Sequence, residues 1–255
     1  MKLLDPRRVM PGLLVASVTL NVALIAYLAN SGGLRRMLLK ADLVEVPKTR
    51  LGFQKELESR FRKLPSTPDE IVFAGDSLVA DGPWAEFYTE VRNRGIGGDT
   101  VAGVLGRIDE ILDDKPRKLF LLIGTNDLAA AVPDVQYLRQ YRKLLERIRQ
   151  ESPGTAVTVL AIFPVNTTFP NPPTYDNDRV AATNGKLKEL VDAFPGVRYL
   201  DLTRILADNT GQLRREFSTD GMHLNLDGYL AIRETLKGPL TEGESPKSTE
   251  EASQP

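Results

Sequence analysis

From Ile71 onward the sequence alternates short apolar runs with longer amphipathic stretches, and this alternation limits the possible folds more than any other feature. The short runs are rich in β-branched and aromatic residues, as strands are, and the longer stretches have the apolar spacing of helices. Alternation of this kind predicts an α/β fold, with a parallel sheet covered by helices on both faces. The expected strands are residues 70–75, 90–95, 118–124, 156–163 and 197–202, and the expected helices are residues 100–113, 134–151, 176–193 and 225–237.

The N-terminal part of the chain has a different character. Residues 9–29 carry no charged side chain, and a helix of this length spans about 30 Å, the thickness of a bilayer core. We expect a retained transmembrane helix here; a cleaved export signal is the second reading and a buried core helix the third. Three basic residues stand on each side of the segment (Lys2, Arg7 and Arg8; Arg35, Arg36 and Lys40), so positive charge selects no orientation. An N-terminal apolar segment commonly directs export, which favours an extracytoplasmic main domain.

Two further segments flank the alternating region. Residues 34–66 are charged and carry apolar residues at helical spacing, which predicts a helical connector. Residues 241–255 are acidic and polar and contain a proline within the run, a composition typical of disorder. We therefore expect the α/β domain over residues 67–240, preceded by an anchor or signal over residues 1–33.

The charge and the residue counts exclude several function classes. Lys and Arg total 33 and Asp and Glu 34, so the chain has no broad basic field to attract nucleic acid. It contains no cysteine and one histidine. Disulfides and thiolate nucleophiles are thereby excluded, and an ordinary zinc site, which needs three or four ligands, is disfavoured. No spacing of carboxylates indicates a magnesium or calcium site.

Active sites of parallel α/β folds form at the carboxyl ends of the strands, so the residues after each expected strand are the candidates. Ser77 lies in Gly75-Asp76-Ser77-Leu78, after the first strand, beside unpaired N–H groups that can hold an oxyanion. The structural alternative is that Asp76 and Ser77 only cap a helix.

The loops after the second and third strands offer further donors. Residues 94–100, RGIGGDT, lack the third glycine of a dinucleotide-binding loop, and no phosphate-binding P-loop occurs in the chain. What remains is a backbone that a substrate can approach, with Asp99 as the expected cap of the next helix. Asn126 of Gly124-Thr125-Asn126-Asp127 carries an uncharged amide suited to an oxyanion hole. A plain turn is the alternative for both loops.

The only histidine of the chain follows the fifth strand. Asp220 and His223 are three residues apart, so both can lie on one side of a tight turn. The carboxylate can then accept from one imidazole nitrogen while the other nitrogen faces a serine hydroxyl. A surface turn before a helix is the alternative reading.

These four stretches, in this order, resemble the SGNH/GDSL hydrolase superfamily, and the wording GIGGDT resembles its platelet-activating-factor acetylhydrolase-like and bacterial acetylesterase branch. The resemblance covers about residues 70–238. It implies a three-layer α/β/α flavodoxin-like sheet, the SGNH hydrolase fold, and a serine esterase that needs no metal or organic cofactor. It implies the catalytic residues Ser77, Asp220 and His223, and an oxyanion hole made by Ser77, Gly98 and Asn126.

The substrate is less constrained than the chemistry. We expect a short-chain ester, first an acetyl ester of a carbohydrate, because the loops are short and polar; lysophospholipid or another lipid ester is second. An O-acetyltransferase using the same acyl-enzyme and a non-catalytic binding module are the rival functions. Loop 164–178 is expected to form one wall of the pocket, and Asn166-Thr167-Thr168 within it fits a glycosylation acceptor. The oligomeric state is left open.

Overall fold

The computed structural model describes residues 51–64, 67 and 69–242. The expected transmembrane segment 9–29, most of the expected connector 34–66, and residues 243–255 of the expected tail lie outside this range. Among the described helices, none combines the length and the apolar character required to cross a membrane.

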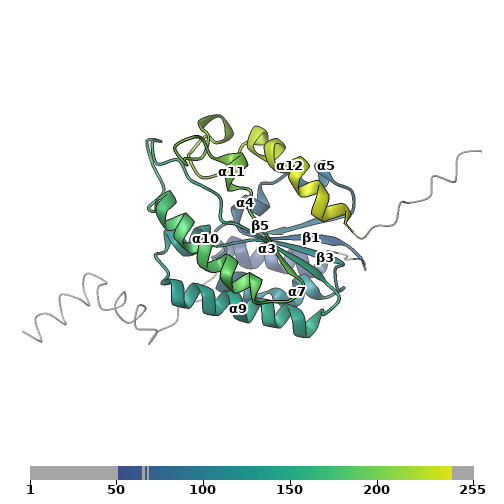
Figure 1. Cartoon of the computed structure of the whole chain (residues 1–255). Helices are drawn as coiled ribbons and strands as arrows, with labels where there is room; N and C mark the ends of the chain where they lie inside the picture. Colours follow the sequence, from purple (N-terminus) through teal and green to yellow (C-terminus); the bar gives the residue numbers. More distant parts are fainter. Residues whose placement is uncertain (1–50, 65–66, 68, 243–255) are drawn as a thin grey trace, which may run out of the picture. The chain divides into compact units, whose positions relative to one another are not determined.

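The centre of the fold is a parallel sheet in the order β2-β1-β3-β4-β5 (Figure 1). This is the flavodoxin-like order, as the family resemblance implies, and the direction of the strand order reverses between β1 and β3. The expected strands are all present, and each is shorter at one end than the sequence indicates. They are β1 (Ile71–Gly75), β2 (Val91–Gly95), β3 (Lys118–Leu122), β4 (Ala156–Leu160) and β5 (Val197–Leu200).

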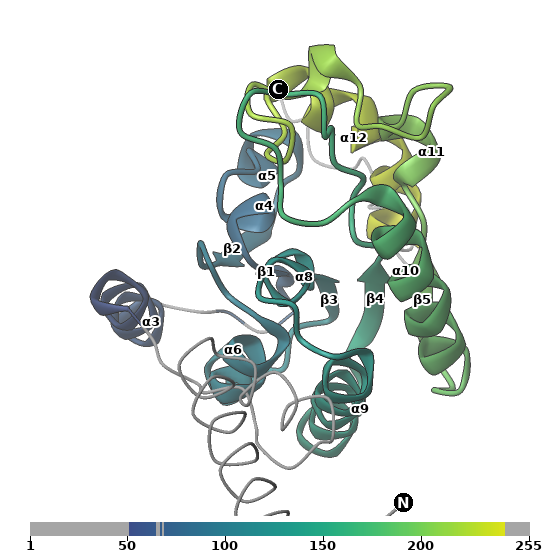
Figure 2. The same cartoon turned by 90° about the vertical axis from the view of Figure 1, so that its left-hand side faces the viewer.

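Helices cover both faces of the sheet, which confirms the expected three layers. Figures 1 and 2 show α4, α5, α11 and α12 on one side of the sheet and α6, α7 and α9 on the other. Helix α10 packs against α9 and β5. The helices are α3 (Gly52–Lys63), α4 (Ser77–Ala80), α5 (Trp84–Phe87), α6 (Val101–Gly106), α7 (Ile108–Leu112), α8 (Thr125–Ala129), α9 (Asp134–Glu151), α10 (Asn177–Asp192), α11 (Thr203–Leu206) and α12 (Leu226–Thr241), with a short 3-10 helix η1 (Arg215–Phe217).

Aromatic rings fill the core between the sheet and α12. Phe73 of β1 stacks on Trp84 at a centroid distance of 4.4 Å and on Phe120 of β3 at 4.6 Å. Tyr229 of α12 meets the Trp84 ring edge-on at 5.5 Å. Large buried rings contribute most of the apolar area of such a core, so this stack fixes the distance between the centre of the sheet and α12.

The expected helix 100–113 is wrong in one respect, because it is divided into α6 and α7 at Arg107. Arg107 has φ −124° and ψ 15°, outside the helical region, and its side chain is fully buried. A guanidinium that turns inward requires acceptors there, and it finds them in main-chain carbonyls at the ends of β1 and β2.

The last helix is longer than expected, since α12 continues through Pro239 to Thr241. The ammonium group of Lys118, at the start of β3, donates to the main-chain carbonyls of Pro239, Leu240 and Glu242. A cation that binds the unpaired carbonyls at a helix C-terminus stabilises the last turn. The sequence near residue 237 does not reveal this partner, because it lies more than a hundred residues earlier.

Candidate active site

Ser77 is the first residue of α4, at the carboxyl end of β1 and next to the point where the strand order reverses. Gly75 ends β1 in close contact with β3: a Cβ atom there would lie 1.9 Å from the main-chain oxygen of Leu122. Asp76 caps α4, and its Oδ1 accepts from the N–H of Leu78 at 3.0 Å. Thus glycine allows the strand to end against its neighbour, and aspartate turns the chain so that Ser77 leads the helix.

Three side chains hold the main chain of α4. The Tyr229 hydroxyl donates to the carbonyl of Leu78 at 2.8 Å. The indole N–H of Trp84 and the amide of Asn93 both donate to the carbonyl of Val79, each at 2.8 Å. A helix of four residues cannot be stable alone, so these bonds from neighbouring elements set the position of Ser77.

The structure brings Ser77, His223 and Asp220 together. The Oγ of Ser77 lies 2.9 Å from Nε2 of His223, and Nδ1 of His223 lies 2.6 Å from Oδ2 of Asp220. His223 is partly buried and Asp220 is exposed. A serine, an imidazole and a carboxylate in this sequence of contacts have the geometry of a nucleophile, a general base and the group that orients the base.

The turn that carries Asp220 and His223 is strongly hydrogen-bonded. Oδ1 of Asp220 accepts from the N–H groups of Met222 and His223, both at 2.8 Å. The buried Ser218 hydroxyl donates to the carbonyl of His223 at 2.7 Å. Desolvation of the covered part of the Asp220 side chain would alone raise its pKa, but the hydrogen bond from the His223 ring and those from the two N–H groups outweigh this effect and lower the pKa to about 2. The carboxylate is therefore ionised at any pH at which the imidazole can act as a base.

Of the other two candidates, Gly98 lies in the turn that follows β2, and Asn126, in α8, contacts that turn. Gly98 is exposed and has φ +76°, a conformation that favours glycine. A Cβ atom on its neighbour Gly97 would lie 4.0 Å from Cβ of Ser77, so this turn is next to the nucleophile. Nδ2 of Asn126 donates to the main-chain carbonyl of Asp99 at 2.8 Å. An amide nitrogen carries two donors and this bond uses one of them, so the bond orients Asn126 beside the turn.

Asp99 does not cap the next helix, contrary to the expectation from the sequence. Thr100 is the cap, and its hydroxyl accepts from the N–H of Gly103 at 3.2 Å. Oδ2 of Asp99 instead accepts from Nε of Arg107 at 2.9 Å. Because a buried guanidinium needs an opposite charge, this contact takes precedence over the cap.

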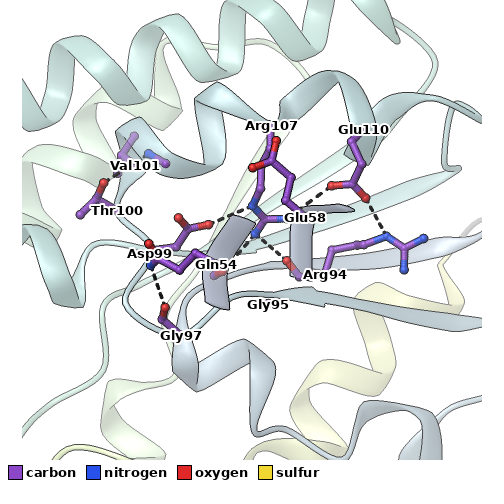
Figure 3. A network of polar contacts seen from close by, with 12 residues as sticks. Gln54, Glu58, Arg94, Gly95, Gly97, Asp99, Thr100, Val101, Arg107 and Glu110 are labelled. Atoms are coloured by element: carbon purple, nitrogen blue, oxygen red, sulfur yellow. Dashed lines mark hydrogen bonds and ion pairs between the residues drawn. The ribbon is translucent and has the colours of Figure 1, made fainter. Parts of the chain in front are cut away.

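Arg107 is a structural residue of the site that the sequence did not reveal. It joins the turn to the sheet, since it also donates to the main-chain carbonyl of Gly75 at 3.3 Å. A further bond joins it to the main-chain carbonyl of Arg94 at 2.6 Å (Figure 3). A single arginine at the end of the apolar stretch 101–106 was the available signal. An arginine at such a place is expected on the solvent-exposed side of an amphipathic helix, and only the break in the helix shows that it turns inward.

Two buried carboxyl groups lie behind the nucleophile. Burial raises the pKa of Asp76 to about 8, with a further rise from the charges of Asp127 and Asp99 and an opposing effect from the Leu78 N–H. Burial likewise raises the pKa of Asp127 to about 7. The N–H of Val101, which donates to Oδ2 of Asp127 at 3.0 Å, has the opposite effect. Close carboxyls in a low-dielectric interior cannot all be ionised, so protons are retained here at neutral pH.

Loop 164–178 contacts the turn of the triad candidates. The N–H of Asn166 donates to the carbonyl of Gly221 at 2.7 Å, and a Cβ atom on Gly221 would lie 3.1 Å from the Phe169 ring. Asn166 is itself only 4% exposed, and its amide donates to the carbonyl of Leu213 at 2.7 Å. The glycosylation-like motif is therefore inaccessible in the folded protein, and the motif has a structural use.

A pocket of about 500 Å³ lies elsewhere, between α10, the end of β5 and α11. Its lining includes Asn184, Lys188, Tyr199 and Arg204 but none of the triad candidates. The contact between the Ser77 hydroxyl and the His223 imidazole lies outside this pocket. In the part of the chain that the structure describes, no three His, Asp or Glu side chains are grouped to hold a metal ion.

Comparison with known proteins gives a consistent result. Residues 73–231 match the family described as GDSL-like lipase/acylhydrolase. A Streptococcus pneumonia structure described as a candidate platelet activating factor is 31% identical, with a TM-score of 0.70 over 73% of this chain and 92% of the other. A candidate acylhydrolase from Bacteroides fragilis, 18% identical, has the same fold, with a TM-score of 0.65 over 76% and 98% of the two chains.

Two further comparisons concern an esterase and a curated enzyme. The acetylxylan esterase Axe2 of Geobacillus stearothermophilus shares the fold at 16% identity, with a TM-score of 0.57 over 71% of this chain and 96% of the other. An N-acylneuraminate cytidylyltransferase of Escherichia coli is 25% identical over 150 residues, which are 58% of this chain. The match spans only 34% of the length of that curated relative.

Proposed function

Because the chain belongs to the GDSL-like lipase/acylhydrolase family and is a hydrolase of the SGNH/GDSL type, we propose that it cleaves short-chain O-esters with Ser77, His223 and Asp220 as its catalytic residues. The observation that carries this proposal is the pair of contacts through His223, 2.9 Å to Ser77 and 2.6 Å to Asp220. Side chains from α4 and from the turn before α12 meet there in the order that acyl transfer requires.

The proposed reaction has two steps. Oγ of Ser77 attacks the ester carbonyl while Nε2 of His223 takes its proton, and Asp220 stabilises the imidazolium that forms. The N–H groups of Ser77 and Gly98 and the amide of Asn126 hold the oxyanion of the tetrahedral intermediate. The proton then passes from His223 to the leaving alcohol. In the second step water, activated by His223, attacks the acyl-serine and releases the acid.

We propose an acetyl or similarly short acyl group, carried by a carbohydrate. Loop 164–178, which contacts the turn of the triad candidates, is mostly polar and contains no long apolar run. The acetylxylan esterase that shares the fold acts on an acetylated polysaccharide by its name, which is in line with this choice. A lipid ester is the second candidate, favoured by the apolar N-terminal segment. Transfer of the acyl group to a sugar hydroxyl is the third.

A panel of p-nitrophenyl esters of graded acyl length tests the proposal. We expect acetyl and butyryl esters to be cleaved faster than dodecanoyl esters, and a reversed order would favour the lipid substrate. Repeating the assay with a saccharide acceptor and measuring acylated saccharide separates a transferase from a hydrolase. A wild-type protein that cleaves none of these esters, while Ser77 also resists an organophosphonate probe, would favour a non-catalytic binding module.

The proposal extends to location. We propose that residues 9–29 retain the protein in a membrane with the hydrolase domain on the outer side, where exported polysaccharides would be within reach. The support is the length and the uncharged character of the segment in the sequence.

A further inference from the structure

Helix α3 has an unusual relationship with the rest of the domain. Three large apolar residues in and beside α3 are exposed to solvent: Leu51, Phe53 and Leu64 are 58%, 51% and 52% exposed. The buried residue of α3 is a polar one, Gln54, at 5% exposed. Leu57 and Phe61 are partly buried, so apolar contact accounts for part of the packing of α3, and Gln54 is its most buried side chain. A buried amide must be satisfied by hydrogen bonds, so the contacts of Gln54 show what the helix does there.

Both ends of the Gln54 side chain are used. Oε1 accepts from the N–H of Leu51 at 2.9 Å, which closes the first turn of α3. Nε2 donates to the main-chain carbonyl of Gly97 at 2.9 Å (Figure 3). The same nitrogen would lie 3.2 Å from a Cβ atom on Gly98. Gln54 thus connects the start of α3 to the glycine turn that follows β2.

The carbonyl of Gly97 and the N–H of Gly98 belong to one peptide group. In a planar trans peptide these two groups point in opposite directions, and the chain contains no cis peptide among its described residues. A bond that holds the Gly97 carbonyl toward α3 therefore directs the Gly98 N–H away from α3. That N–H is the proposed oxyanion donor, and the turn that carries it is next to Ser77.

The rest of the turn is fixed from within the domain. Asn126 donates to the carbonyl of Asp99, and Arg107 donates to its carboxylate. The N–H of Asp99 donates to the carbonyl of Ile96 at 3.0 Å. These bonds secure the two sides of the Gly97–Gly98 peptide. A peptide between two glycines has more conformational freedom than any other, and Gln54 is the side chain that binds its carbonyl.

We infer that Gln54 is a positioning residue for the oxyanion hole and that α3 is a working part of the hydrolase. This inference rests on the proposed function. Helix α3 lies before residue 73, where the match to the family begins, so the family comparison does not assign it this role. Arg94 supports the same arrangement, because its guanidinium lies 5.0 Å from the centre of the Phe61 ring and holds the second half of α3.

The test is Gln54→Met in the full-length protein. Methionine has a similar length and shape but cannot donate to Gly97. Misdirecting one oxyanion donor affects the transition state more than the bound ester. We expect kcat for p-nitrophenyl acetate to fall about tenfold or more while KM stays within about twofold. We also expect the amides of residues 96–101 to exchange hydrogen faster.

Two matched variants separate this role from the stability of α3. Glu56→Ala breaks an exposed pair with Arg60 on the same helix and does not touch the turn, so both readouts should remain at the wild-type values. Leu51→Pro removes the N–H that donates to Oε1 of Gln54, but it leaves the bond from Nε2 of Gln54 to the Gly97 carbonyl. Leu51 has φ −70°, which proline adopts without strain. Its kcat should remain within about threefold of the wild type.

Each outcome decides something. An unchanged kcat in Gln54→Met overturns the inference even if hydrogen exchange rises, and so does an equal loss of kcat in Leu51→Pro. If the wild-type protein cleaves no ester, the proposed function fails by itself, and unchanged exchange in residues 96–101 of Gln54→Met would then separately overturn the claim that Gln54 holds the turn.

Discussion

The hydroxyl of Tyr229 donates to the main-chain carbonyl of Leu78 at 2.8 Å, and this bond joins the two helices on which the proposed chemistry depends. Leu78 follows Ser77 in α4, and Tyr229 lies in α12, which begins shortly after His223. Both partners are buried. The nucleophile and the base are thus held in register by a contact behind them and not only by the contact between them.

Tyr229→Phe should weaken both the fold and the reaction. The buried Leu78 carbonyl would lose its partner, which costs about 1–3 kcal/mol of the free energy of unfolding. Since α4 would also be less well placed, we expect kcat to fall several-fold. Tyr88→Phe is the matched control, because the hydroxyl that it removes donates to the carbonyl of Arg233 in α12 and not to a carbonyl of α4. It should lower stability in urea unfolding and leave kcat unchanged; equal kcat in the two variants would contradict the positioning of Ser77 by Tyr229.

Replacement of the triad candidates should separate their roles. Ser77→Ala and His223→Ala should each reduce ester hydrolysis by on the order of 10⁶-fold, because the nucleophile and the base act as a unit. Asp220→Asn should retain more activity, with a loss of about 10⁴-fold. Initial rates with p-nitrophenyl acetate measure this, with circular dichroism as the control for folding. Substantial turnover by Ser77→Ala would refute the mechanism.

Asn126→Ala tests the oxyanion hole. Loss of one preorganised donor lowers kcat by about 10²–10³-fold. The variant also loses the bond to the Asp99 carbonyl, so the thermal unfolding midpoint has to be measured alongside the rate. A fall in kcat of less than tenfold would restrict Asn126 to supporting the turn.

The buried carboxyls predict how stability depends on pH. The pKa of Asp76 is raised to about 8 and that of Asp127 to about 7, so between pH 4 and pH 8 the folded state keeps protons that the unfolded state has released. Stability therefore falls as pH rises through this window. The contribution of Asp220, whose pKa is lowered to about 2, is constant there. We expect the midpoint of thermal unfolding to fall by on the order of 5 °C between pH 5 and pH 8.

Asp76→Asn provides the check on this explanation. Asparagine caps a helix about as well as aspartate but carries no proton to lose, so the dependence on pH should become shallower. Asp81→Asn, at the exposed end of the same helix, is the matched control and should retain the wild-type slope. A slope that is identical in all three proteins would mean that other groups cause it.

The proposed location can be tested in cells that express the full-length chain. Deletion of residues 1–30 should move an active enzyme from the membrane fraction to the soluble fraction. Protease added to intact spheroplasts should digest the full-length protein if its hydrolase domain faces outward. Protection that lasts until the membrane is broken would place the domain in the cytoplasm.

Much of the fold follows from local patterns. The strands and the long helices α9 and α10 were predictable because their apolar periodicity is set by residues close in sequence. The break at Arg107 and the extension of α12 to Thr241 were not, since each depends on acceptors or donors from distant elements. In the candidate site too, residues in local motifs could be predicted and residues that act through distant contacts could not. Motifs identified Ser77, Asp220 and His223 as candidates, whereas Tyr229, which binds α4, and Gln54, which binds the turn after β2, form no motif.

The burial of Asn166 has a consequence for the choice of production host. In the secretory pathway of a eukaryote, a glycan is attached to an Asn-x-Thr motif before the chain has folded. A sugar on Asn166 would replace a hydrogen on the nitrogen that donates to the Leu213 carbonyl and would be too large for a side chain that is 4% exposed. Yeast or mammalian secretion would therefore divide the product into an unmodified fraction that folds and a modified fraction that cannot. Expression in bacteria avoids this loss.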